Sequence, residues 1–302
     1  MKRLLVLRLS ALGDVIHTIP AVVALRHANP DERIAWVVEA PYRELVELVA
    51  GVEAIPVRMK KWGKSLLASR GEMRDALRAM RGADTSIDFQ GLVKSAMLGA
   101  LAGAKTRIGF DARAIREKPA LLFTNRKVHV DTTKHVIDQN LQLANVQYAR
   151  SNWETFPTPV DVDMRDAIVF LPGAGKANKL WPVTRFRELA QRLGDRVLVT
   201  WGPGERDLAE QIGARLAPPT NLRELAWILR HARLVIGGDT GPLHLADALG
   251  TKVIGLYGPT DPRRNGPYAQ LGHCLSQFEG TKCMESITVE HVMNMVQRVA
   301  AE

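Results

Sequence analysis

Short apolar runs alternate with longer amphipathic segments along most of the chain. In the first half the apolar runs cover residues 3–9, 33–38, 85–89 and 106–110, and amphipathic segments cover residues 42–50, 64–80 and 92–101. The second half has apolar runs at 167–171, 196–200, 234–236 and 252–256, and helical patterns at 183–193, 205–216, 222–231 and 242–249. Strands that alternate with crossover helices are typical of a parallel, wound α/β sheet. The pattern therefore predicts the α/β class, with one such sheet in each half.

A polar, proline-containing stretch at residues 151–166 separates the two series of elements. The length of 302 residues suits two domains, since a typical domain has about 150 residues. We predict one domain over residues 1–150 and a second over residues 167–302, joined by this stretch as a linker. Open α/β sheets bind ligands at the carboxyl ends of their strands, so we expect the active site in the cleft between the two domains.

The composition excludes several classes of protein. Hydrophobic residues make up 46% of the chain and charged residues 24%, which is a globular balance and not that of a disordered chain. No apolar run approaches the length of a membrane-spanning helix, and Arg8 and Asp14 interrupt any signal-like hydrophobic start. Cys274 and Cys283, even with His273, lack the spacing of a zinc site. We therefore expect a cytoplasmic protein without a bound metal.

The net charge of +9 indicates an anionic partner, such as a nucleotide, a phosphorylated glycan, a phospholipid or a nucleic acid. Basic residues gather around Trp62 and again after residue 112; they are Lys60, Lys61, Lys64, Arg113, Arg116, Lys118, Arg126 and Lys127. These clusters fit either an ordinary solvated surface or the binding of an anionic substrate. Trp62 with Leu66 and Leu67 would then touch lipid headgroups. No helix-turn-helix, zinc-finger or RNP-like pattern supports nucleic acid as the partner.

The glycine-rich segment 237–244, GGDTGPLH, follows an apolar run and opens a helical pattern. Its glycines allow the backbone to approach a ligand, and the free N–H groups of a helix start favour phosphate. The alternative is a tight turn in which Asp239 or Thr240 only caps the helix.

A second glycine-rich loop, residues 172–179, has the sequence PGAGKANK. It matches neither a Walker A loop nor a dinucleotide fingerprint, because Ala177 and Asn178 stand where those motifs need other residues. Lys176 and Lys179 are placed to neutralise a departing diphosphate without a metal. Solvated lysines on a surface loop are the alternative.

Asp14 lies in the segment that joins the first strand to the first helix, where an open α/β sheet presents catalytic groups. It is a candidate general base, and His17 could share that role; the alternative for Asp14 is a helix cap. Pro20 is too far from Val15 for a first-turn proline, so we expect the helix to kink or to begin near Thr18. That would free Asp14 from capping.

Several motifs in a fixed order resemble the bacterial lipopolysaccharide heptosyltransferases, and most closely their heptosyltransferase I branch. The resemblance covers nearly the whole chain. It rests on SALGDVIHTIP at 10–20, DFQGLVKS at 88–95, REKPA at 116–120, NRK at 125–127, KLWP at 179–182, WG at 201–202, DTG at 239–241 with His244, and YGPTDP at 257–262. It implies two facing Rossmann-like domains of the GT-B architecture.

The resemblance also implies a reaction: an inverting transfer of L-glycero-D-manno-heptose from ADP-heptose to the first Kdo sugar of Kdo-lipid A, on the cytoplasmic face of the inner membrane. It implies no cofactor and no nucleic-acid partner. Asp14 matches the general base, and the residues that match donor contacts are Ala174, Gly175, Lys179, Glu205, Asp239, Thr240, Gly241 and His244. The acceptor-binding residues would be Lys60, Lys61, Lys64 and Arg116. The sequence departs from the family pattern at Lys60 and Lys61, where arginines are expected, and at residues 174–175, where a hydroxyl-bearing pair is expected.

Other functions remain open on the sequence. Heptosyltransferase II, or another nucleotide-sugar enzyme of the same architecture such as an epimerase, would use the same donor loops. A non-enzymatic nucleotide or polyanion binder would show steeply salt-dependent affinity for polyanions in general.

Overall fold

The computed structural model describes residues 2–65, 67–149, 153 and 160–302. The chain divides into two compact units, Met1–Thr155 and Phe156–Glu302. Of the predicted linker, residues 151, 152 and 154–159 lie outside the described residues. None of the helices among the described residues is long and apolar enough to cross a membrane.

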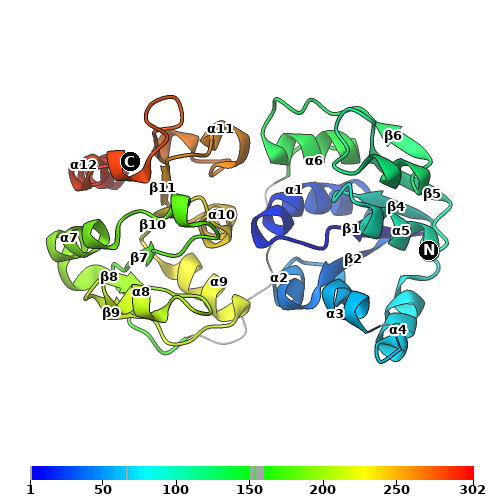
Figure 1. Ribbon diagram of the computed structural model, residues 1–302, viewed down its shortest axis with the longest axis horizontal. Helices are drawn as coiled ribbons and strands as arrows, with labels where there is room; N and C mark the ends of the chain where they lie inside the picture. The colour runs from blue at the N-terminus through cyan, green and yellow to red at the C-terminus, as the bar shows by residue number, and fades with distance from the viewer. Residues whose placement is uncertain (1, 66, 150–152, 154–159) are drawn as a thin grey trace. The chain divides into compact units, whose positions relative to one another are not determined.

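The first unit is built on a parallel sheet that has six strands within its described residues, in the order β3-β2-β1-β4-β5-β6 (Figure 1). Its strands are β1 (Arg3–Leu7), β2 (Arg33–Glu39), β3 (Val52–Val57), β4 (Thr85–Asp88), β5 (Thr106–Phe110) and β6 (Arg126–Val128). Its helices are α1 (Leu12–Ala28), α2 (Arg43–Val46), α3 (Met59–Lys64), α4 (Arg70–Met80), α5 (Val93–Leu101) and α6 (Val136–Ala144), with 3-10 turns η1 (Ala40–Tyr42) and η2 (Lys118–Leu122).

Side-chain alternation along β1 gives this sheet two buried faces. Leu5, Leu7 and Leu9 belong to one hydrophobic cluster with the β3 residues Ile55 and Val57, and this cluster also contains residues of α3, α4 and α5. Helix α1 packs against α6. A sheet buried on both faces explains why the central strands are continuous apolar runs in the sequence.

The second unit has a parallel sheet in the order β12-β11-β10-β7-β8-β9, again six strands among the residues that the structure describes. Its strands are β7 (Ile168–Leu171), β8 (Val197–Val199), β9 (Arg215–Leu216), β10 (Leu234–Gly238), β11 (Val253–Tyr257) and β12 (Cys274–Ser276). Its helices are α7 (Val183–Leu193), α8 (Arg206–Glu210), α9 (Leu222–His231), α10 (Gly241–Ala248), α11 (Pro262–Asn265) and α12 (Val289–Ala301), with 3-10 turns η3 (Ala177–Lys179), η4 (Gly194–Arg196), η5 (Leu271–His273) and η6 (Met284–Ser286).

Both sheets have the same topology. From its β9 edge, the second sheet reads β9-β8-β7-β10-β11-β12. If β7 is counted as its first strand, this order is 3-2-1-4-5-6, the same as in the first sheet. In each sheet the winding reverses between the two central strands, β1 and β4 in the first and β7 and β10 in the second. Ligand sites of wound sheets lie at this reversal, beyond the carboxyl ends of the central strands.

The predicted fold class is confirmed, and four predicted helices are corrected. The pattern at 205–216 is not one helix: α8 ends at Glu210, and Gly213 with φ +75 leads the chain into β9. The segment 64–80 is divided between the end of α3 and all of α4, and the helix expected at 42–50 is only α2. Helix α1 begins at Leu12, not near Thr18, and continues through Pro20.

Candidate active site

Asp14 lies in the first turn of α1, the helix that follows β1. Its Oδ2 accepts a hydrogen bond of 3.4 Å from the Ala11 amide, so Asp14 does carry a capping contact. This corrects the expectation that Pro20 frees it. A proline inside a helix costs about 3 kcal/mol, but the residues of α1 from Val15 to Leu25 are all buried. Their apolar burial offsets the lost hydrogen bond, which is why the helix continues.

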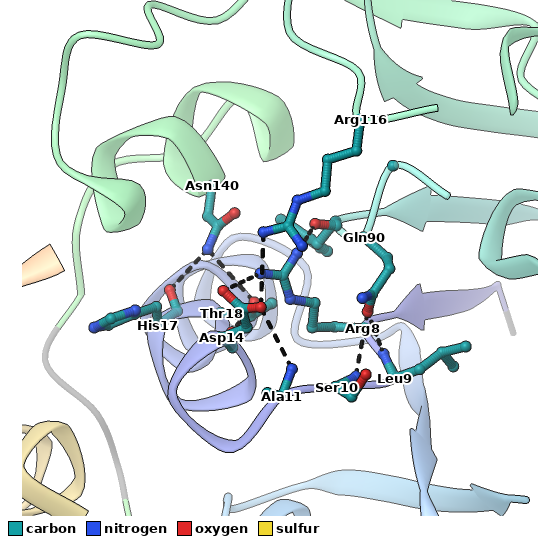
Figure 2. A network of polar contacts seen from close by, with 12 residues as sticks. Arg8, Leu9, Ser10, Ala11, Asp14, His17, Thr18, Gln90, Arg116 and Asn140 are labelled. Atoms are coloured by element: carbon teal, nitrogen blue, oxygen red, sulfur yellow. Dashed lines mark hydrogen bonds and ion pairs between the residues drawn. The ribbon is translucent and has the colours of Figure 1, made fainter. Parts of the chain in front are cut away.

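Two guanidinium groups bind the Asp14 carboxylate (Figure 2). Arg8 Nη2 lies 2.7 Å from Oδ1, and the Arg8 side chain is only 3% exposed. Arg116 Nη2 lies 3.7 Å from Oδ2, and its side chain is 52% exposed. The carboxylate therefore contacts a buried cation on one oxygen and a solvent-exposed cation on the other.

The backbone around Asp14 is held by residues of β2 and α6 and by a residue that follows β4. Gln90 Oε1 accepts hydrogen bonds from the amides of Leu9 at 2.9 Å and Ser10 at 3.2 Å. The Trp36 indole donates to the carbonyl of Arg8 at 3.0 Å. Asn140 of α6 donates to the carbonyl of His17 at 2.9 Å. These bonds fix the turn that presents the carboxylate.

Asp88 is a second carboxyl group next to this turn, at the end of β4, and it is almost fully buried. Its Oδ1 accepts hydrogen bonds from the amides of Gln90 at 3.0 Å and Gly91 at 3.2 Å. Burial raises the pKa of Asp88 to about 6, although these hydrogen bonds, the Ser95 side chain and the charge of Arg8 act in the opposite direction. Asp88 therefore titrates close to neutral pH.

The second unit gathers a charged cluster around Asp239, which follows β10. Lys179 Nζ lies 2.6 Å from Oδ2, while His244 Nε2 at 3.2 Å and Asn265 Nδ2 at 2.9 Å contact Oδ1. Burial by itself would raise the pKa of Asp239, but the hydrogen bonds and charges of His244 and Lys179 outweigh it and hold the pKa below its usual value. Asp239 is thus an ionised anchor that sets the position of Lys179.

Two close backbone approaches shape the loop at residues 172–179. A Cβ on Gly173 would lie 2.1 Å from Glu205 Oε1, so a larger residue at 173 would displace that carboxylate. Glu205 Oε2 also accepts a hydrogen bond from the Gly202 amide at 2.9 Å. A Cβ on Gly237 would lie 2.7 Å from Leu171 Cβ, which keeps the two central strand ends together. Glu205 thus packs directly against the glycine-rich loop that carries Ala174 and Gly175.

Thr240 is the N-cap residue of α10, and Gly241 is the first residue of that helix. The Thr240 hydroxyl is buried and has no hydrogen-bond partner within the described part of the chain. Buried hydroxyls are normally hydrogen-bonded. Together with the start of α10, this hydroxyl is suited to donate a hydrogen bond to a phosphate oxygen or to pair with a sugar hydroxyl.

The predicted acceptor lysines lie on α3 and are exposed. Lys61 Nζ is 2.6 Å from Glu72 Oε1, so one of the three already has an intramolecular ion pair. Trp62 is only 5% exposed and packs in the hydrophobic core of the first unit, which makes the expected lipid contact by Trp62 wrong. The physical reason is that α3 turns its indole inward, where Nε1 also donates to Glu72. Leu66 lies outside the described residues, and Leu67 is 73% exposed.

The structure therefore forms two groups of the predicted residues. Asp14 and Arg116 meet in the first unit, and Lys179, Asp239 and His244 meet in the second. Sequence reasoning missed Arg8, Gln90 and Asn265. A signal for Arg8 was present, because a charge between Leu7 and Leu9 in an apolar strand is expected to be buried and paired.

The residues around the two cysteines have other partners. His273 Nε2 lies 2.8 Å from Glu302 Oε2, and Cys283 Sγ donates to Glu285. Both cysteines are free thiols, and burial raises the pKa of Cys274 to about 12. In the described ranges, no three His, Cys, Asp or Glu side chains are grouped so that they could hold a metal ion.

Comparison with known proteins assigns the chain to a family. The model of glycosyltransferase family 9 (heptosyltransferase) matches residues 70–293. Lipopolysaccharide heptosyltransferase 1 of Escherichia coli strain K12 is 34% identical over 292 residues, which cover 89% of this chain and 91% of that protein.

Solved structures of E. coli heptosyltransferase WaaC agree with this match. The structure with ADP has a TM-score of 0.88 at 30% identity, and the structure with ADP-2-deoxy-2-fluoro heptose has a TM-score of 0.84 at 29% identity. Each alignment covers 98% of this chain and 99% of the solved one. The two wound sheets are thus those of a GT-B glycosyltransferase, and the chain belongs to glycosyltransferase family 9, the heptosyltransferases.

Proposed function

We propose that this chain is the heptosyltransferase that moves L-glycero-D-manno-heptose from ADP-heptose to the first Kdo of Kdo-lipid A, with inversion at the anomeric carbon. The observation that carries the proposal is the similarity, over 98% of the chain, to a heptosyltransferase solved with ADP-2-deoxy-2-fluoro heptose. Curated relatives at 34% identity are named lipopolysaccharide heptosyltransferase 1, which favours this branch over heptosyltransferase II.

The second unit would bind the donor. Lys179 is the cation for the diphosphate, and its ion pair with Asp239 supports this role by fixing the ammonium group beside the start of α10. His244, Thr240 and Gly241 would complete the phosphate contacts, with amides and a hydroxyl at a helix start. Ala174 and Gly175 would lie along the diphosphate, and Glu205 would bind the ribose hydroxyls. Because protein cations can stabilise the leaving diphosphate, we propose that no metal or other cofactor is required.

The first unit would supply the base. Asp14 would take the proton of the attacking Kdo hydroxyl, whose oxygen forms the new bond to heptose C1. The bond between C1 and the phosphate oxygen breaks, and its electron pair leaves with ADP. Attack from the side opposite the leaving group accounts for inversion. The barrier is lowered because the base is positioned at the attacking oxygen and cations are positioned at the leaving diphosphate.

The acceptor carries phosphates and Kdo carboxylates, so cations should bind it. Lys60, Lys61 and Lys64 on α3 and Arg116 beside Asp14 are the proposed contacts. Support comes from their exposure and from the 3.7 Å between Arg116 and the proposed base. An acceptor with a lipid anchor would bring the protein to the cytoplasmic face of the inner membrane as a peripheral protein.

Product analysis by mass spectrometry tests the proposal. The purified protein is incubated with ADP-heptose or UDP-glucose, and with Kdo-lipid A or heptosyl-Kdo-lipid A. We expect one heptose to be added only with ADP-heptose and Kdo-lipid A. Addition only to the heptosylated acceptor would indicate heptosyltransferase II. Conversion of a donor without any acceptor would indicate an epimerase. If no product forms and the protein binds polyanions with an affinity that falls steeply with salt, it is a binding protein.

A further inference from the structure

A buried arginine stands behind the proposed base. Arg8 follows β1 directly, and its side chain is 3% exposed. One terminal nitrogen donates to the carbonyl of Phe89, and the other lies 2.7 Å from Asp14 Oδ1. Its Nε is buried without a hydrogen-bond partner among the described residues. Burying a guanidinium that is not fully hydrogen-bonded opposes folding, so stability alone does not account for an arginine here.

The two oxygens of Asp14 have different surroundings. Oδ1 has the short, charge-assisted contact of 2.7 Å with Arg8. Oδ2 has only the longer contacts, 3.4 Å from the Ala11 amide and 3.7 Å from Arg116 Nη2. Contacts of that length are weak. A carboxylate oxygen has about two acceptor sites, and those of Oδ2 have only these longer contacts. Oδ2 is therefore the oxygen better placed to take a proton from an incoming hydroxyl group.

Arg8 is itself held from two neighbouring strands, β2 and β4. Its head group binds the carbonyl of Phe89, which follows β4, and its carbonyl accepts the hydrogen bond of Trp36 from β2. The next two amides, of Leu9 and Ser10, donate to Gln90 (Figure 2). Arg116, in contrast, is half exposed and lies 3.7 Å from Oδ2. Arg8 is the close, buried contact of the carboxylate and Arg116 the longer, exposed one.

We propose that Arg8 is a positioning residue for heptosyl transfer: it holds Oδ1 of Asp14 and thereby directs Oδ2 toward the acceptor hydroxyl. This inference rests on the proposed function, in which Asp14 is the base. The hydroxyl proton goes to Oδ2, the hydroxyl oxygen bonds to heptose C1, and the electron pair of the broken C1–O bond departs with ADP. Arg8 touches none of the reacting atoms and acts only through the angle of the carboxylate.

The test uses the full chain and the variants Arg8→Met and Arg8→Lys. Misplacing a catalytic group by about 1 Å costs on the order of 10²-fold in rate, so we expect Arg8→Met to lower kcat about 100-fold. Acceptor KM and the Kd for ADP should stay within about twofold, because Arg8 contacts neither substrate in the proposed mechanism. Arg8→Lys should recover part of the rate, since one ammonium group can bind Asp14 but has no planar fork for Phe89 as well.

Arg107→Met is the matched control. Arg107 is also a partly buried arginine of the first unit that binds main-chain carbonyls, those of Phe123 at 2.7 Å and Ala104 at 2.9 Å. It should lose thermal stability without losing kcat. If Arg8→Met does not fold, Arg8→Lys replaces it in the test, with an expected loss of at least about tenfold in kcat. Native kcat in the folded Arg8 variant would overturn the proposal.

A double-mutant cycle separates positioning from a general structural role. In an Asp14→Asn background, replacing Arg8 should cause no further loss of the residual rate, measured as product by mass spectrometry after long incubation. A further loss of about tenfold or more would also overturn the proposal. If Asp14→Asn itself turns over at the native rate, the assignment of the base fails. If Asp14→Asn is inactive while the Arg8 variant is native-like, only the positioning role fails.

Discussion

As the proposed base, Asp14 would have to be held in place and still keep one oxygen open, and its guanidinium contacts at 2.7 Å and 3.7 Å fit this requirement. We expect Asp14→Ala to reduce heptose transfer by about 10² to 10⁴-fold, the usual range for the loss of a general base. The Kd for ADP-heptose should change little, because the base acts on the acceptor. Initial rates and calorimetric titration with the donor check this, and a variant with near-native turnover would rule out Asp14 as the base.

Asp88 should make stability depend on pH. Its folded pKa is about 6, above the ordinary value of 3.8, so the folded state binds the proton more tightly than the unfolded state. The contribution of Asp88 to the free energy of unfolding is therefore fully present below about pH 4, and it is lost as the pH rises through 6. In an Asp88→Asn variant, the amide oxygen could still accept hydrogen bonds from the amides of Gln90 and Gly91.

We predict that Asp88→Asn gains stability relative to the native chain between pH 4 and pH 7, by about 2 kcal/mol. Urea unfolding at several pH values measures the difference. A pH-independent difference between the two proteins would contradict the raised pKa.

Arg8 and Asn265 show where reasoning from single residues fails. Asp14 and Asp239 stand next to glycines and Lys179 lies in a glycine-rich loop, so their types and places in the sequence already indicated chemistry. Arg8 looked like part of a strand, and only the packing of Phe89 and Asp14 around it gives it a role. Asn265 is distant in sequence from Asp239, and no local pattern predicts their contact of 2.9 Å.

At the scale of elements, the central strands were predicted and the edge strands were not. Each edge strand, β3, β6, β9 or β12, lies at one side of its sheet. Edge strands are shorter or more polar because one side has no neighbour, and Pro56 in β3 is tolerated for the same reason. Apolar periodicity therefore identifies the middle of a wound sheet better than its borders.

The turn between β10 and α10, together with the Lys179 loop, should determine donor binding. We predict that Lys179→Ala and His244→Ala each weaken ADP-heptose binding by about tenfold, because charge-assisted hydrogen bonds to phosphate contribute about 1.5 to 3 kcal/mol. Titration calorimetry measures the Kd. A chelator should leave native activity intact; activity that is lost in chelator and restored by one divalent ion would contradict stabilisation by the protein alone.

Helix α3 should act on the acceptor and not on the donor. We predict that changing Lys60, Lys61 and Lys64 together to alanine raises the acceptor KM and flattens its dependence on salt, because exposed cations attract anions through screened charge. Arg116→Ala should have the larger single effect, since a guanidinium binds a carboxylate with two hydrogen bonds. Initial rates at two ionic strengths check this. An unchanged acceptor KM would indicate that the lysines of α3 are only part of a solvated surface.

At the scale of the whole molecule, each half of the chain has its own sheet and core, so we expect the two substrates to bind to different halves. We predict that ADP slows hydrogen exchange in peptides containing residues 173–179 and 239–244, because a ligand stabilises the residues that it binds. Peptides covering residues 8–18 should exchange as in the free protein. Mass spectrometry of the full chain measures this, and protection of the Asp14 turn by ADP alone would contradict the division.

The fold class and two separate series of strands and helices could be predicted from the sequence, since apolar periodicity reports burial directly. The contacts within each site could not, because they join residues distant in the chain, such as Lys179 with Asp239. The expected ligand cleft between the two halves stays a prediction.

The shared strand order of the two sheets has an evolutionary consequence. Among the described residues, every strand ladder joins strands of the same half, so a recombination event between α6 and β7 leaves these backbone pairings intact. Donor preference and acceptor preference can then be inherited as independent modules on one repeated topology. A chimera that joins residues 1–149 of this chain to the second half of a relative with another nucleotide sugar should fold and should change its donor while keeping its acceptor.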